Sequence, residues 1–187
     1  GSYLNGEVVD SMGGGICQVS TTLYNAVLRA ELNVTERSPH SMTVHYVDLS
    51  EDAAIAGTYK DFKFKNSTEY PIYIEGYTTS DKKITFNIYG KETRDSNRSI
   101  SFESVLVNEV KPNTILQGIG YKAVSSKGSS GYVAELYKIV KVNGVQTDRI
   151  KINKSTYKGS DRVVTYGTAG DPTLSENLRA AIAAQDE

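Results

Sequence analysis

The hydrophobic residues near the start of the chain follow a helical period over one segment, residues 16–32. The apolar positions of its stripe are Ile16, Val19, Leu23, Ala26, Val27 and Ala30. Spacings of three and four residues place these side chains on one face of a helix. Asn33 is a suitable C-cap, and Pro39 prevents any continuation. We therefore predict a helix over residues 16–32.

After Pro39 the apolar residues alternate with polar ones, which is the period of a β-strand. The alternating segments are 42–47, 62–64, 72–77 and 84–89, and residues 80–83 supply a hairpin turn between the last two. Near the N-terminus, two short apolar pairs flank an Asn5-Gly6 turn. Residues 1–92 are therefore predicted to form an α+β domain in which one helix packs on an antiparallel sheet.

The second half of the chain reads as β structure without helices until its end. A polar stretch from Lys91 to Arg98 marks the predicted boundary between the two halves. Strand-like runs follow at 99–107, 119–124, 132–142, 145–152 and 162–166, and Asn143-Gly144 is a hairpin signal. We predict an elongated all-β domain over 99–168 and a short C-terminal helix within 172–187.

Composition narrows the function classes only slightly. A net charge of −1 gives no sign of a surface that binds nucleic acid or an anionic membrane. The sequence contains no run of 18 apolar residues, the length that a membrane-spanning helix needs. One cysteine excludes an intrachain disulfide framework. The residues suggest no cofactor. Gly1-Ser2 looks like a cloning remnant, so we expect the chain to be a piece of a longer protein.

Cys17, the single cysteine, follows three glycines and opens the predicted helix. One interpretation is a small buried residue at a tight corner. The other is a nucleophile, because a helix N-terminus stabilises a thiolate and its free N–H groups, those of Cys17 and Gln18, can bind an oxyanion.

A nucleophilic cysteine needs a base, and the chain offers only His40 and His45. On a regular strand these two residues would face opposite sides, so at most one can reach Cys17. The orienting carboxylate could be Asp52 or Asp61, and Asp61 is the better placed because it opens a predicted strand. A metal site is disfavoured, since one cysteine and two opposed histidines cannot supply three convergent ligands.

The order of these residues resembles the transglutaminase-like cysteine fold. In that fold a cysteine opens a helix that ends in Leu-Arg-Ala, followed by an arginine, a strand histidine and an aspartate. The matching residues here are Cys17, Leu28-Arg29-Ala30, Arg37, His40 or His45, and Asp61. The tryptophan that often follows the family's histidine has no counterpart, because the chain contains no tryptophan.

A longer set of sequence words resembles the VanW family over residues 3–90. These words are Gly13-Gly14-Gly15-Ile16-Cys17-Gln18-Val19-Ser20-Thr21-Thr22-Leu23-Tyr24-Asn25-Ala26, Glu36-Arg37, His40-Ser41, Asp52-Ala53, Asp61-Phe62-Lys63-Phe64-Lys65-Asn66 and Pro71-Ile72-Tyr73-Ile74. The start of the family pattern, upstream of Tyr3, is absent. The family pattern includes Arg37 and His40 but not His45, which favours His40 as the partner of Cys17.

The VanW resemblance implies a bacterial cell-envelope protein, mostly of Gram-positive organisms, whose biochemical role is not established. The family takes its name from an accessory gene of a vancomycin-resistance cluster. Its members often carry a membrane anchor and a peptidoglycan-binding module upstream, so a membrane would be reached only through segments outside this chain. We expect Arg37, Gln18 and Ser41 to contact substrate, with Arg37 as a clamp for a carboxylate.

Residues 99–168 resemble the G-five domain, an extended β module of surface proteins that is associated with cell-wall glycan. The matching parts are Ser101-Phe102-Glu103, Gln117-Gly118, Lys127-Gly128-Ser129-Ser130-Gly131, Val142-Asn143-Gly144-Val145 and Tyr166-Gly167-Thr168. A passive spacer is the alternative, because glycines at hairpins need no ligand.

Two functional hypotheses follow from the sequence. The first is a non-catalytic extracellular module that binds peptidoglycan or cell-wall glycan. The second is a cysteine-dependent transferase or hydrolase of wall peptides, in which Cys17 attacks, His40 accepts its proton and Asp61 orients the imidazole.

Overall fold

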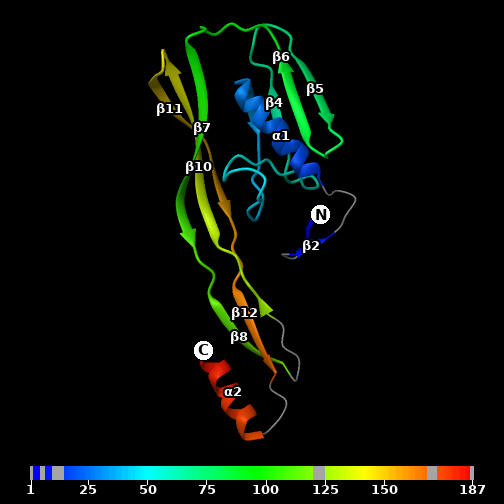
Figure 1. Cartoon of the computed structure of the whole chain (residues 1–187), viewed down its shortest axis with the longest axis vertical. Coiled ribbons are helices and arrows are strands. Elements are labelled where there is room, and N and C mark those ends of the chain that lie inside the picture. The colour runs from blue at the N-terminus through cyan, green and yellow to red at the C-terminus, as the bar shows by residue number, and fades with distance from the viewer. Residues whose placement is uncertain (1, 5–6, 10–14, 120–124, 168–171, 186–187) are drawn as a thin grey trace. The chain divides into compact units, whose positions relative to one another are not determined.

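The computed structural model describes residues 2–4, 7–9, 15–119, 125–167 and 172–185, and it is mostly β structure with few helices (Figure 1). The chain forms two compact units. The first combines Gly1–Val107 with Val133–Tyr157, and the second combines Asn108–Tyr132 with Lys158–Glu187. The first unit therefore joins strands from both halves of the sequence.

Helix α1 spans Ile16–Arg29 and starts after Gly15, whose φ of 105° suits glycine. The helix ends three residues before its predicted end at Leu32, because Glu31 adopts a left-handed φ of 55°. The N–H of Glu31 donates to the Leu28 carbonyl and that of Leu32 to the Val27 carbonyl, which is a Schellman ending.

Glu31 occupies the left-handed position after the helix end, where glycine is usual, and its ion pairs offset the conformational strain of the backbone. Its carboxylate accepts hydrogen bonds from Arg94, Arg98 and Lys138 at 2.5–2.9 Å. The left-handed conformation costs about 1–2 kcal/mol for a residue with a side chain. Hydrogen bonds from three cations to a mostly buried carboxylate can exceed that cost.

Helix α1 packs with two separate two-stranded ribbons and not with the single sheet that the sequence predicts. Strand β3 (Asn33–Glu36) pairs antiparallel with β4 (Lys63–Lys65), and β5 (Tyr73–Thr78) pairs antiparallel with β6 (Ile84–Tyr89). Helix α1 contacts both ribbons through β6 and β3. The predicted C-cap, Asn33, is the first residue of β3. A transglutaminase-like arrangement is not confirmed.

The predicted strand at 42–47 is wrong, because residues 37–55 contain neither helix nor strand. Side chains of α1 hold this segment by binding its backbone. Ser20 and Thr21 donate to the Ala53 carbonyl at 2.6 and 3.2 Å, and Asn25 donates to the Glu51 carbonyl at 2.7 Å. These bonds replace the partner strand that the alternating pattern would need.

At the N-terminus, β1 (Ser2–Leu4) and β2 (Glu7–Val9) pair antiparallel, as the apolar pairs predict. The predicted turn at Asn5-Gly6 lies outside the described residues. These two strands belong to the first compact unit.

Long strands dominate the second half of the sequence. Strands β7 (Arg98–Val110), β10 (Gly131–Val142) and β11 (Val145–Tyr157) form a sheet in the order β11-β10-β7. Positive φ values of 51° and 79° at Asn143 and Gly144 confirm the hairpin between β10 and β11. Strand β11 continues five residues beyond the predicted end at 152.

The second compact unit contains a smaller sheet and the terminal helix. Strand β12 (Arg162–Gly167) runs parallel to β8 (Thr114–Ile119) and antiparallel to β9 (Ser125–Ser126). Helix α2 spans Pro172–Ala184, as predicted. Most of the strand predicted at 119–124 lies outside the described residues.

The core of the first unit lies between α1 and the long sheet. Its buried members are Tyr24, Leu28, Ala53 and Leu136, and Val34, Phe62, Phe102 and Ile152 pack around them. Leu136 and Ile152 come from β10 and β11, so the second half of the sequence completes the core of the first.

We predict that Leu136→Ala lowers the free energy of unfolding by about 2–5 kcal/mol, because the fully buried side chain would leave a cavity. Leu106→Ala is the matched control, since Leu106 is 51 % exposed on β7 and its loss should cost less than about 0.5 kcal/mol. Urea unfolding measures both variants. Equal effects would contradict a core shared by the two halves.

Candidate functional site

Cys17 lies in the first turn of α1, where the sequence places it. Its side chain is partly buried, and its Sγ lies 3.4 Å from the carbonyl oxygen of Ile55. The first N–H groups of a helix have no partner within the helix, so they are available as donors near this position. A thiolate here gains from both the helix dipole and these donors.

His40 connects Cys17 to a buried carboxylate. Its ring Nδ1 lies 2.6 Å from Oδ2 of Asp52, and its backbone N–H donates to the same oxygen at 2.6 Å. The other ring nitrogen is not used by Asp52, and the influence of His40 is the first-named cause of a lowered pKa at Cys17. His45 is exposed, so His40 is the histidine that the fold brings to Cys17.

The carboxylate at His40 belongs to Asp52 and not to Asp61, which we expected to orient the ring. Asp61 is 46 % exposed and binds the backbone N–H of Phe62 at 2.8 Å and Lys63 at 3.4 Å. Asp52 is 1 % exposed and lies next to the residues that α1 anchors. The structure therefore brings together Cys17, His40 and Asp52.

Arg37 faces this carboxylate and is itself buried, with 6 % of its side chain exposed. It donates from Nη2 to Asp52 Oδ1 at 2.7 Å, from Nε to the Asp52 carbonyl at 2.6 Å and from Nη1 to Ser155 Oγ at 2.8 Å. Its guanidinium also lies 5.6 Å from the ring centre of Tyr24. In this arrangement Arg37 holds Asp52 in place and does not present a free fork to solvent.

The two other predicted substrate-binding residues lie at the surface. Gln18 is exposed in the first turn of α1, next to Cys17. Ser41 is exposed after His40, and its Oγ accepts a hydrogen bond from Lys60 at 3.3 Å. Because both side chains are exposed, contact of Gln18 and Ser41 with a substrate stays a proposal.

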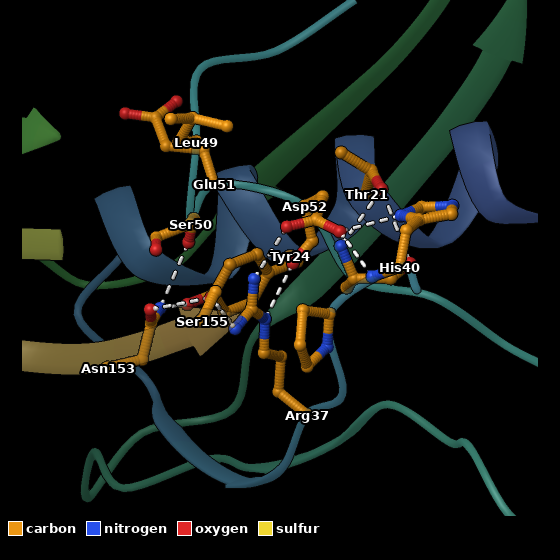
Figure 2. A network of polar contacts seen from close by, with 12 residues as sticks. Thr21, Tyr24, Arg37, His40, Leu49, Ser50, Glu51, Asp52, Asn153 and Ser155 are labelled. Atoms are coloured by element: carbon orange, nitrogen blue, oxygen red, sulfur yellow. Dashed lines mark hydrogen bonds and ion pairs between the residues drawn. The ribbon is translucent and has the colours of Figure 1, made fainter. Parts of the chain in front are cut away.

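Residues at the end of β11 complete the network around Asp52, and the sequence reasoning missed them (Figure 2). Tyr157 donates its hydroxyl to Asp52 Oδ1 at 2.6 Å and accepts the Ser50 N–H at 2.7 Å. Asn153 donates to the Tyr24 hydroxyl at 2.8 Å. A row of polar side chains at 153, 155 and 157, one strand face, is the sequence signal that could have indicated them.

The electrostatics of the three residues favour a thiolate–imidazolium pair. Burial alone would lower the pKa of His40, but its hydrogen bonds with Asp52 and Cys17 outweigh burial and raise the pKa to about 9. The hydrogen bond with His40 lowers the pKa of Cys17 against the opposing effect of burial. For Asp52, burial would raise the pKa, while His40 and Arg37 together lower it. Both shifts act in the direction that places the proton on the imidazole.

Known families match both halves of the chain. The family described as VanW like protein matches residues 1–89, and the G5 domain matches residues 91–169. The chain contains a VanW-like domain followed by a G5 domain. The VanW-like domain supplies Cys17, His40 and Asp52, and the G5 domain supplies Ser155 and Tyr157.

Two curated proteins resemble parts of the chain. The uncharacterized protein YoaR of Bacillus subtilis (strain 168) is 45 % identical over 71 residues, which are 38 % of this chain and 23 % of that protein. The vancomycin B-type resistance protein VanW of Enterococcus faecalis (strain ATCC 700802 / V583) is 30 % identical over 92 residues, 46 % of this chain and 32 % of that protein. The chain thus spans less than a third of each relative.

A solved G5 domain of an IgA1 protease shares 19 % identity with the chain at a TM-score of 0.29, covering 39 % of this chain and 94 % of that one. The described residues contain no group of three His, Cys, Asp or Glu side chains that could hold a metal ion. No helix in the described segments is long and apolar enough to cross a membrane.

The lowered pKa of Cys17 predicts that it reacts with iodoacetamide below pH 8.5, the ordinary thiol value. Asp52→Asn should slow labelling at pH 6.5 by about tenfold or more, because the imidazolium loses its carboxylate. Labelling reports on Cys17 alone, since it is the single cysteine. Intact-mass spectrometry against time and pH gives the rates.

Asp61→Asn is the matched control for this labelling experiment, because it removes an exposed carboxylate from the same domain. Circular dichroism checks that both variants remain folded. If Asp61→Asn slowed labelling as much as Asp52→Asn, the assignment of Asp52 as the partner of His40 would be wrong.

Proposed function

We propose that this chain belongs to a bacterial cell-envelope protein in which Cys17 catalyses acyl transfer on peptides of the cell wall. The observation that carries the proposal is the His40 ring, which contacts the buried Asp52 at 2.6 Å and lowers the pKa of the thiol at the start of α1. Nucleophile, base and orienting group in this order are the pattern of a cysteine acyltransferase or hydrolase. The resemblance to the vancomycin B-type resistance protein VanW of Enterococcus faecalis supports the cell wall as the setting.

The first step of this chemistry forms a thioester. The Cys17 thiolate attacks the carbonyl carbon of an amide, and unpaired N–H groups of the first turn of α1 stabilise the oxyanion. His40 then donates its proton to the leaving nitrogen as the carbon–nitrogen bond breaks. Asp52 keeps the imidazole oriented and stabilises its positive charge.

The second step releases Cys17. Neutral His40 removes a proton from water or from an acceptor amine, which attacks the thioester carbonyl as the carbon–sulfur bond breaks. Water gives hydrolysis, and an amine gives transfer to a new peptide. The arrangement of Cys17, His40 and Asp52 serves both outcomes, because the acceptor only has to reach the same imidazole.

A non-catalytic binding module is the second candidate, and the burial of the polar network favours it. Arg37, Asp52 and Tyr157 hold the irregular segment 37–55 against β11, which is a structural task in itself. The G5 domain also supports a wall glycan as a partner. In this alternative Cys17 is only a packing residue.

Turnover of cell-wall peptides by the purified chain tests the catalytic proposal, with products followed by mass spectrometry. We expect Cys17→Ala to abolish turnover, His40→Ala to reduce it at least about 100-fold and Asp61→Asn to leave it nearly unchanged. Turnover by a Cys17→Ala variant would contradict the catalytic proposal. Wild-type binding of wall fragments without turnover, unchanged by Cys17→Ala, would establish the second candidate.

A further inference from the structure

Lys60 lies at the proposed active site without a role in the chemistry described above. Its ammonium donates to the Pro39 carbonyl at 2.6 Å and to Ser41 Oγ at 3.3 Å, and these residues flank His40 on both sides. A backbone bridge between Ala56 and Lys60 fixes the loop that follows Ile55, whose carbonyl contacts the Cys17 thiol. Lys60 is thus attached to both sides of the site.

Lys60 forms no direct ion pair with a carboxylate in the described part of the chain, although the charges of Asp52 and Cys17 act on it. Among the described residues, no carboxylate oxygen lies within 4.0 Å of its Nζ, although the side chain is partly buried. Burial of the ammonium lowers the pKa of Lys60 against the opposing effect of Asp52 and Cys17. A desolvated cation is costly unless an anion approaches it.

The whole site carries one net positive charge in its thiolate–imidazolium form. The positive charges of Arg37 and His40 are matched by two negative charges, those of Asp52 and the Cys17 thiolate. Lys60 adds a third cation. Its ammonium has three N–H groups, and two of them are used by Pro39 and Ser41. One donor therefore remains for a ligand, at a site with a surplus of one positive charge.

We propose that Lys60 selects substrates with a free carboxylate close to the bond that Cys17 attacks. The inference rests on the proposed acyl transfer and adds its substrate class, peptides with an unblocked carboxylate. Arg37, which the sequence suggested for this task, is occupied by Asp52 and Ser155. Ser41 supports Lys60 by accepting one of its hydrogen bonds.

The carboxylate has two possible sources in a peptide. It can be the C-terminal carboxylate of the residue that leaves, or a carboxylate on the acyl side of the bond. Pairs of alkylating reagents distinguish these sources, because each pair differs only in a carboxylate against its amide. In the first pair, iodoacetate and iodoacetamide, the carboxylate or its amide is bonded directly to the reacting carbon. In the second pair, bromoacetyl-glycine and bromoacetyl-glycinamide, the carboxylate or its amide lies one residue further from the reacting carbon.

The test measures alkylation of Cys17 by each reagent at pH 7 and low salt, in wild type, Lys60→Met, Lys60→Arg and Lys63→Met. We expect Lys60→Met to lower the carboxylate-to-amide rate ratio by roughly 3–10-fold in at least one pair, as a lost charge at short range predicts. Lys60→Arg should keep most of the ratio. Lys63→Met is the control, because Lys63 is exposed and paired with Glu36 and Asp61.

The outcomes separate the two proposals. A Lys60-dependent ratio in the glycine pair supports recognition of a leaving residue's carboxylate, and one in the acetate pair supports a carboxylate on the acyl side. Unchanged ratios in both pairs, with rapid iodoacetamide labelling, would overturn the role of Lys60 and leave the nucleophile intact. Slow iodoacetamide labelling of wild type at pH 7 would instead overturn the nucleophile, and the substrate class with it.

Discussion

One buried carboxylate, that of Asp52, organises the first compact unit. It accepts hydrogen bonds from Arg37, Tyr157 and both the backbone and the ring of His40, at 2.6–2.7 Å. A charge that is 1 % exposed is tolerable only when such partners surround it. The irregular segment that carries Asp52, the end of β11 and the proposed catalytic histidine therefore depend on one another.

This interaction also explains why the VanW-like and G5 domains share a core. The Asp52 network needs Ser155 and Tyr157 from β11, and the apolar core needs Leu136 from β10. A VanW-like domain without these strands would leave Arg37 and Asp52 with fewer partners in an exposed position. The G5 strands of this chain thus take part in positioning the site.

The sequence was sufficient for local features and insufficient for long-range ones. The helix start at Cys17 and the Asn143-Gly144 hairpin follow from spacing and turn chemistry, which are local. Asp61 was preferred over Asp52 because it opens a predicted strand, but the carboxylate that contacts the His40 ring is that of Asp52, in the segment predicted as a strand after Pro39 and found irregular. Side chains of α1 bind that segment instead, and no periodicity reports such bonds. Tyr157 lies 105 residues from Asp52, beyond any motif.

The central claim is that Asp52 keeps His40 protonated beside the Cys17 thiolate at neutral pH. NMR of ring-labelled histidine measures this directly, with His40→Ala to assign the two histidine signals. The account predicts that the His40 ring remains an imidazolium at pH 7.5 and titrates with a pKa of about 9. A His40 signal that titrated near 6.5, the ordinary histidine value, would contradict it.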